Sequence, residues 1–209
     1  MYAILAALAV GATPPPLECL THLDAGTVPT GPPLAVAFRP FNRGTAAVTV
    51  LGVDAGCGCL KPTVSQTDLR PGDNAEVGLT VNTLTQPPGP ATWTATVRYR
   101  VAGETEVRQL PLTVAATLAK RVTVTPPSVA FSTEGAADQT LTVADAGPRP
   151  LTVVAAAATS PHLSATVGPG GAVRVAVSKD FPPGDADETV TLATDDPACP
   201  ELRVPVKVS

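Results

Sequence analysis

Short runs of β-branched and other apolar residues alternate with turn signals about every ten residues from Leu34 onward, a spacing typical of a β-sandwich. Within one such run, the period of two along a strand places Trp93 and Tyr99 on the same face. The pattern therefore predicts an all-β protein. Strands are predicted over residues 35–41, 45–53, 60–64, 75–81, 92–101 and 106–118.

The second half of the chain repeats this pattern. Residues 131–147 correspond to residues 23–44, and similar strand and turn signals follow each segment. Self-similarity of this kind indicates a tandem of one architecture. The connection at residues 119–121 leads straight into the next apolar run, so it is too short to be a flexible tether. We predict two tandem immunoglobulin-like β-sandwich domains, residues 20–118 and 119–209, placed end to end with limited hinge freedom.

The composition agrees with an all-β fold. The 24 Pro and 17 Gly disfavour long helices, and the 27 Val and 28 Thr favour strands. The chain has a net charge of -4, and its 14 Lys and Arg are scattered rather than clustered. Nucleic-acid binding requires a positive stripe, so nucleic acid is not an expected partner.

The N-terminus indicates export. Residues 1–12 form an apolar stretch that is too short to span a bilayer and that ends in the small-residue pattern of a signal-peptidase site at Val10 and Ala12. Residues 13–19 are interpreted as a linker. No transmembrane segment is predicted elsewhere, and the expected location is the periplasm or the cell surface, in association with the cell envelope.

Short motifs recur in a fixed order through the first half of the chain: Phe38-x-x-Phe41-Asn42-x-Gly44, Gly56-Cys57-Gly58-Cys59 and Leu69-x-Pro71-Gly72. In this order they resemble the bacterial domain-of-unknown-function family numbered 1573. The resemblance implies immunoglobulin-like domains related to Hydin-like and major-sperm-protein-like sandwiches, which mostly serve as interaction or scaffold modules. The second half lacks the Cys-Gly-Cys element.

The candidate site is the loop around Cys57, Gly58 and Cys59, together with Cys19. In an extended strand, two cysteines separated by one residue lie near the upper distance limit of a disulfide, so each is expected to pair elsewhere or to stay free. Cys19, interpreted as lying on the first strand, is one candidate partner. The alternatives are a recognition loop, a Cu(I) or Zn(II) site and a redox pair.

The other reactive side chains are interpreted as structural. His22 and His162 are expected to be ordinary surface histidines, and Cys199 is expected to be exposed at a hairpin tip, as a free thiol or an intermolecular link. Asp195 and Asp196, with three more acidic residues at positions 185–188, are interpreted as a solvated acidic end rather than a Ca²⁺ site. Hydrolase motifs are not found, so no catalytic residue, metal or cofactor is predicted.

The expected function is therefore that of an exported, non-enzymatic scaffold or protein-binding module with an unidentified protein partner. The Cys loop is its predicted recognition tip, and edge strands could also accept a partner strand. The alternative from a different class is a thiol-based Cu/Zn-binding or redox accessory protein that uses Cys57 and Cys59. A periplasmic chaperone of the pilus type is a third hypothesis, which rests on fold analogy alone.

Overall fold

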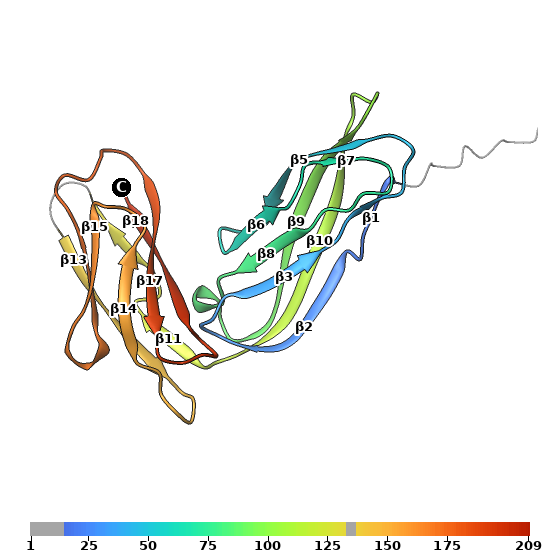
Figure 1. The fold of residues 1–209 in the computed structure, drawn as a ribbon. Helices are drawn as coiled ribbons and strands as arrows, with labels where there is room; N and C mark the ends of the chain where they lie inside the picture. The colour runs from blue at the N-terminus through green and yellow to red at the C-terminus, as the bar shows by residue number, and fades with distance from the viewer. Residues whose placement is uncertain (1–14, 133–136) are drawn as a thin grey trace, which may run out of the picture.

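A computed structural model describes residues 15–132 and 137–209. Within these residues the chain forms eighteen β-strands and two short 3₁₀ turns, and no α-helix. The all-β class predicted from the sequence is confirmed. Figure 1 shows two sandwiches, one formed by the first half of the chain and one by the second.

The first sandwich, domain 1, consists of two main sheets and one small strand pair. The larger sheet contains, in spatial order, β2 (His22–Pro29), β10 (Val107–Ala119), β9 (Gly89–Val101), β5 (Val48–Ala55) and β7 (Asp68–Leu69). The second sheet contains β3 (Leu34–Phe38), β8 (Val77–Val81) and β6 (Leu60–Val64). The small pair is β1 (Leu17–Glu18) with β4 (Phe41–Asn42), and the 3₁₀ turn η1 (Thr83–Thr85) follows β8.

The second sandwich, domain 2, has two four-stranded sheets. One contains β11 (Val122–Thr125), β13 (Ala137–Asp145), β16 (Val173–Val177) and β15 (Leu163–Val167). The other contains β12 (Val129–Phe131), β18 (Glu201–Val208), β17 (Ala186–Thr194) and β14 (Val153–Ala158). The 3₁₀ turn η2 (Pro169–Gly171) precedes β16. Each sandwich also contains one parallel strand pair, β2 with β10 and β12 with β18.

Strand alternation builds the two cores. In β9, every second residue from Trp93 to Val101 is buried, so Trp93 and Tyr99 share the buried face as predicted. One predicted strand differs in the structure. Residues 35–41 are divided into β3 and β4, because Pro40 between them has no N–H to donate to a ladder. The buried apolar residues form two clusters, one centred in each sandwich, which fits the two units expected from the sequence. Leu17, in the segment interpreted as a linker, belongs to the first cluster.

The two sandwiches are joined by a short connection that is hydrogen-bonded on both sides. Thr30, at the end of β2, donates its backbone N–H to Ala119 O (2.8 Å) and accepts from Val122 N–H (3.2 Å). Its hydroxyl donates to Val122 O and accepts from Arg121 N–H. Thr30 is buried, so these bonds are shielded from water. The connection is therefore a fixed joint.

The sandwiches meet at one end of each, but they are inclined toward one another rather than continuing in a straight line (Figure 1). Leu84, in η1 of domain 1, packs into the hydrophobic cluster of domain 2. Gly31 allows this close approach, because a Cβ at this position would lie 2.8 Å from Val122 Cβ. The inclination turns the β3-β8-β6 sheet of domain 1 toward the β12-β18-β17 sheet of domain 2.

Candidate functional site: a groove between the domains

A groove of about 870 Å³ lies between the two sandwiches. Domain 1 lines it with Gly58, Cys59, Lys61, Thr80 and Asn82, and domain 2 lines it with residues of β12, β17 and β18. Its walls are the outer faces of two sheets. On β18, for example, the core-facing residues 202, 204 and 206 are buried, while residues 203, 205 and 207 line the groove. The groove therefore exists only because the joint holds the two sheets at an angle.

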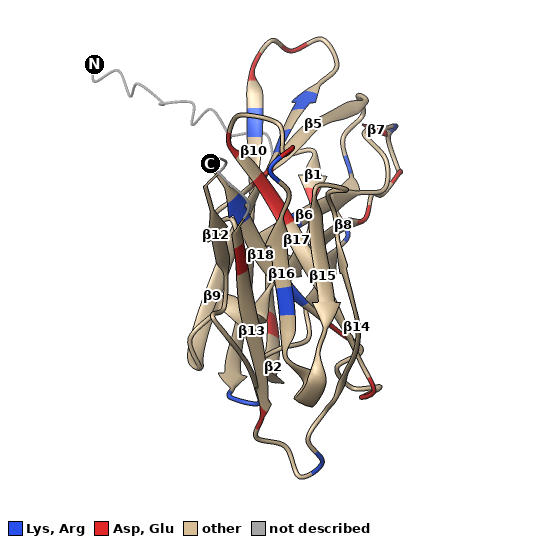
Figure 2. Ribbon diagram, turned by 90° about the vertical axis from the view of Figure 1, so that its left-hand side faces the viewer, with Lys and Arg blue, Asp and Glu red and all other residues tan. Residues whose placement is uncertain are grey.

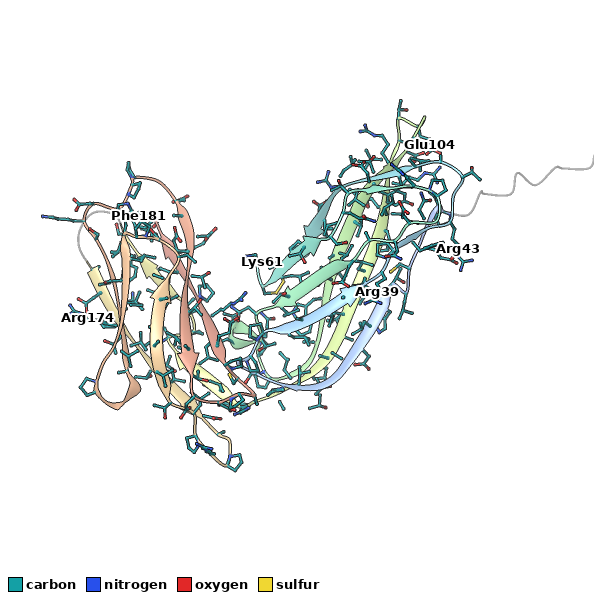
Figure 3. The ribbon with its side chains drawn as sticks, in the orientation of Figure 1. Arg39, Arg43, Lys61, Glu104, Arg174 and Phe181 are labelled. Carbon is teal, nitrogen blue, oxygen red and sulfur yellow. A yellow bond between two sulfur atoms is a disulfide. The ribbon has the colours of Figure 1, made fainter. Side chains whose placement is uncertain are left out.

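The groove carries charges of both signs. On the domain 2 wall, Arg203 forms an ion pair with Glu201 (2.7 Å), and Lys207 lies 4.0 Å from Asp187. On the domain 1 wall, Lys61 is exposed and has no ion pair among residues 15–132 and 137–209. Figure 3 shows Lys61 on the side of domain 1 that faces domain 2. Figure 2 shows acidic and basic positions interspersed along the strands on this side of the molecule.

The Cys57-Gly58-Cys59 loop lies at this groove, and its two cysteines are bonded to each other. The expectation that they pair elsewhere or stay free is therefore wrong. It assumed an extended strand, whereas residues 56–59 form a turn between β5 and β6 and bring the two Cα atoms to 5.2 Å. This distance lies within the ordinary range for a disulfide. The sulfur atoms are not thiolates in this form, so the metal-binding alternative applies only to the reduced loop.

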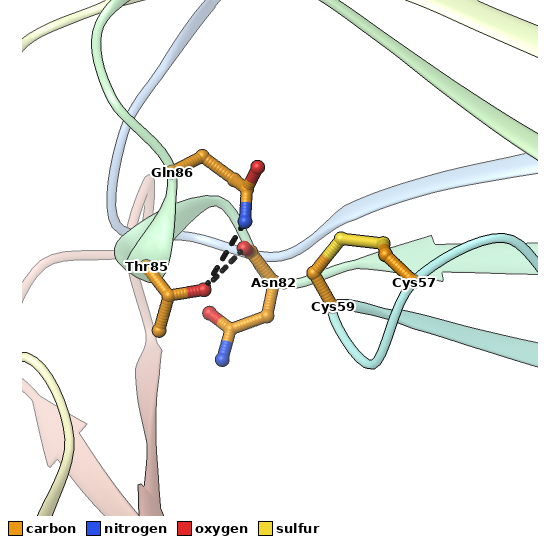
Figure 4. The surroundings of a disulfide bond; sticks show 5 residues. All are labelled: Cys57, Cys59, Asn82, Thr85 and Gln86. Carbon is orange, nitrogen blue, oxygen red and sulfur yellow. Dashed lines mark hydrogen bonds between the residues drawn. A yellow bond between two sulfur atoms is a disulfide. The ribbon is translucent and has the colours of Figure 1, made fainter.

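Backbone hydrogen bonds hold the loop on both sides of the disulfide. Gly56 N–H donates to Thr94 O (2.9 Å), and Asn82 N–H donates to Cys59 O (2.8 Å). Gly56 is required at its position, because a Cβ would lie 2.7 Å from Thr94 O. Figure 4 shows the disulfide beside Asn82 and the η1 turn. The loop therefore lies beside residues 82–85, at the end of domain 1 that meets domain 2.

Asn82 connects the Cys loop to domain 2. Its side-chain amide donates to Arg203 O on β18 (3.0 Å), and its Oδ1 accepts from Leu84 N–H at the start of η1 (3.2 Å). The next residue, Thr83, is fully buried. Its hydroxyl donates to Pro32 O (2.7 Å) and accepts from Gly31 N–H (3.0 Å). One short segment, residues 82–84, thus positions the loop, the turn and the facing sheet together. Sequence reasoning missed this segment, whose only local signal is an apolar Leu84 between polar residues.

Cys19 lies between β1 and β2 rather than on a strand, and its thiol is free. The hypothesis of a disulfide from Cys19 to the loop is therefore wrong for this structure. Partial burial raises the pKa of the Cys19 thiol.

Cys199 is free and fully buried, not exposed as its place between prolines suggested. The turn of residues 196–199 directs the side chain inward, because Asp196 accepts both Ala198 N–H through its carboxylate (2.8 Å) and Cys199 N–H through its carbonyl (3.0 Å). Burial raises the pKa of the Cys199 thiol to about 11. An intermolecular link through Cys199 would need this turn to open.

We expect Cys199 to resist alkylation in the folded protein, because its sulfur is inaccessible and almost entirely protonated near neutral pH. Brief iodoacetamide treatment followed by peptide mass spectrometry should label Cys19 but leave Cys199 unlabelled. Denaturant should then make both thiols react. Equal labelling of the two thiols in the folded protein would contradict the buried position.

The remaining candidate residues are not brought together. Asp187 and Asp195 lie at opposite ends of β17, so the expected single acidic end of domain 2 is not formed. Asp196 is paired with Arg121 in the joint. His162 packs edge-on against Phe181, and His22 is exposed on β2. Within the described parts of the chain, no group of three or more His, Cys, Asp or Glu side chains is arranged to hold a metal.

The motif residue Asn42 has a structural position on the opposite side of domain 1 from the joint. Its side chain is fully buried and donates to Ala46 O (3.0 Å) and Leu69 O (2.9 Å), and it accepts from Gly44 N–H (2.9 Å). Gly44 is needed because a Cβ would lie 2.8 Å from Pro16 Cβ. The Asn-x-Gly motif therefore holds loops of domain 1 together through these hydrogen bonds.

The predicted export signal, residues 1–12, lies outside the residues that the structure describes. Over residues 15–132 and 137–209, no helix is long and apolar enough to cross a bilayer.

Over residues 15–132 and 137–209, the chain is built from immunoglobulin-like β-sandwiches without an α-helix. Residues 19–114 match the family described as "Protein of unknown function (DUF1573)". The resemblance seen in the sequence motifs is thereby confirmed over this segment. No curated protein matches the sequence.

Solved structures with a similar fold include a protein of unknown function from Porphyromonas gingivalis W83, with 15% identity, coverage of 93% of this chain and 100% of that chain, and a TM-score of 0.38. The periplasmic chaperone SfaE has 16% identity, coverage of 92% and 98%, and a TM-score of 0.38. The Vibrio cholerae VesB protease has 15% identity and a TM-score of 0.43 over 49% of this chain, which spans only 32% of that protein. Because these sequence identities and TM-scores are low, the similar structures do not indicate a function for this chain.

Proposed function

We propose that the protein is an exported binding module of the cell envelope, located in the periplasm or at the cell surface, that holds a protein partner in the groove between its domains. The observation that carries the proposal is the groove itself. Two sheet faces from different domains line it, and a buried, hydrogen-bonded joint keeps them at a set angle. A surface that needs two domains and a fixed joint is suited to recognition.

The lining of the groove favours a polypeptide over a small organic ligand. Small-molecule sites are typically rich in aromatic side chains. Among the described residues that line this groove, no side chain is aromatic, whereas threonine hydroxyls and paired charges are frequent. Such a surface can form many dispersed hydrogen bonds with a polypeptide backbone.

The partner is expected to lie between the two sheet faces rather than to extend a sheet. The sheet edge nearest the Cys loop is β6, which pairs only with β8 in its sheet. Lys61 and Pro62 on this strand are residue types that discourage strand addition at an edge. The groove faces therefore remain the better docking surface.

Two features support export. Disulfides such as Cys57–Cys59 persist mainly in oxidising compartments, and the apolar residues 1–12 have the pattern of a secretion signal. Fusion of the full chain to a reporter enzyme that is active only outside the cytoplasm should give activity, and removal of residues 1–12 should abolish it. Equal reporter activity without those residues would argue against this signal.

The binding role is tested by photocrosslinking in cells of the source organism. A photoreactive amino acid at Lys61 or Thr189, one on each wall of the groove, should capture the same discrete partner. Arg174, on the side of domain 2 away from the groove (Figure 3), is the matched exposed control. Equal capture from position 174, or no capture from either groove position, would contradict the proposal.

A further inference from the structure

We propose that the Cys57–Cys59 disulfide is a thiol–disulfide exchange site whose substrates are cysteine thiols of a protein held in the groove. Delivery of that substrate rests on the binding role proposed above, whereas the exchange chemistry belongs to the loop itself. The proposal assigns a chemical function to the loop at the groove, and it names the partner class as a protein with two neighbouring reduced cysteines.

The disulfide contributes little to holding the fold together. It joins residues separated by Gly58 alone, and the stabilisation from closing a loop falls as the loop becomes shorter. Hydrogen bonds already hold the loop on either side, from Gly56 to Thr94 and from Asn82 to Cys59. Because hydrogen bonds already hold both ends of the loop, the disulfide adds little to the stability of the fold. Its presence therefore indicates another role.

The disulfide is accessible from the groove. Cys57 and Cys59 are partly exposed, and Cys59 lines the groove beside Gly58. Gly58 is exposed and carries no side chain, so this side of the loop is open toward the groove. A substrate thiol in the groove would therefore meet the Cys59 sulfur first, with Cys57 as the leaving group.

The local charge favours thiolate chemistry at this wall. Lys61 lies two residues after Cys59, lines the same groove and has no ion pair within the described parts of the chain. A nearby ammonium group stabilises both an attacking and a departing thiolate. The acidic residues of the groove, Asp187 and Glu188, lie on the opposite wall, where Asp187 is 4.0 Å from Lys207 and Glu188 accepts from the Thr159 hydroxyl.

The exchange balances without an additional oxidant. A substrate thiolate attacks Cys59 Sγ, a mixed disulfide forms, and the Cys57–Cys59 bond breaks to release the Cys57 thiolate, which takes up a proton. The second substrate thiolate then attacks the substrate sulfur of the mixed disulfide and releases the Cys59 thiolate, which is also protonated. The substrate ends with one new disulfide, and the loop ends as a dithiol, so the substrate is oxidised and the loop is reduced by two electrons.

The experiment uses the purified full chain with Cys19→Ser, which leaves buried Cys199 as its single cysteine outside the loop. A reduced peptide with two cysteines is added, the reaction is quenched with acid, and free thiols are alkylated for mass spectrometry. We expect one peptide to be oxidised per loop reduced, while circular dichroism shows that the protein stays folded. If the bond opens only at denaturant concentrations that unfold domain 1, the exchange proposal is wrong.

Two pairs of variants locate the chemistry. In the Cys57→Ser variant, oxidised glutathione should form a stable mixed disulfide at Cys59. In the Cys59→Ser variant, it should form one more slowly at Cys57. The reverse order of rates would overturn the assignment of Cys59 as the attacked sulfur.

The lysine variants test the role of the charge. Lys61→Gln should slow exchange roughly threefold, as expected for the loss of one exposed neighbouring charge, and Lys207→Gln on the opposite wall should not slow it. Equal effects of both lysine variants would remove the role assigned to Lys61.

The two proposals can fail separately. Exchange by the purified protein without groove-specific crosslinking in cells would overturn the binding role and leave the chemistry standing. Crosslinking of a partner from positions 61 and 189, with a disulfide that is inert in the folded protein, would overturn the exchange chemistry and leave the binding role standing.

Discussion

Replacement of Asn42 by alanine is expected to lower the free energy of unfolding of domain 1 by about 2–4 kcal/mol. The Asn42 side chain is fully buried and makes three hydrogen bonds, to Ala46 O, Leu69 O and Gly44 N–H. Alanine would leave these three groups without their partner, and the bond to Leu69 O is buried. A buried group left unpaired costs more than the same bond contributes when it is formed.

The loss can be measured by chemical denaturation followed through the fluorescence of Trp93, the single tryptophan, which is buried in domain 1. Asn74→Ala is the matched control, because Asn74 is exposed and the change should alter stability by less than about 0.5 kcal/mol. If the two variants have the same denaturation midpoint, Asn42 does not hold the loops together as the structure indicates.

Strand positions could be predicted because their signal is local. Alternation with a period of two places Trp93 and Tyr99 on the same face of a strand, independently of contacts with distant residues. The structure confirms that both side chains are buried on one face. Asn42 was recognised as part of a motif, but its role was not predicted. That role depends on the carbonyl of Leu69, which only the folded chain brings within 2.9 Å.

The candidate site could be predicted only in part, because long-range contacts create it. The Cys-Gly-Cys loop was identified from its residue types, but the bond within it depends on a turn that is held by Thr94 of β9 and by Asn82, which follows β8. Cys199 was misplaced for the same reason, since a hairpin between prolines carries no local sign of burial. The groove has no signature in the sequence, because its two walls belong to different repeats.

Replacement of Leu84 by alanine is expected to release the joint between the domains. Leu84 is only 8% exposed and packs into the core of domain 2, although it belongs to the η1 turn of domain 1. Truncation of a buried leucine costs about 2–5 kcal/mol. Because the lost contacts lie between the domains, we expect the variant to weaken the association of the two domains. Each sandwich should remain folded.

The consequence should be visible as a change in the distance between domains. Spin labels attached to unnatural amino acids at the exposed positions Arg39 and Arg174 should give a narrow distance distribution in the parent chain and a broad one with Leu84→Ala. Leu20→Ala is the matched control, because Leu20 is 76% exposed and touches neither core cluster. An unchanged narrow distribution with Leu84→Ala would show that the hydrogen bonds of Thr30 and Thr83 hold the joint without this packing.

The same variant connects the joint to function. The groove walls belong to different domains, so a partner that contacts both walls must restore their angle when it binds to the Leu84→Ala protein. Part of its binding free energy would then be used for docking the domains. Crosslinking from Lys61 and Thr189 should therefore fall together in this variant, whereas exchange of the Cys57–Cys59 disulfide with a small thiol, which needs only domain 1, should be unchanged. A loss of both activities would place the joint in the chemistry of the loop as well, through the hydrogen bond from Asn82 to Cys59.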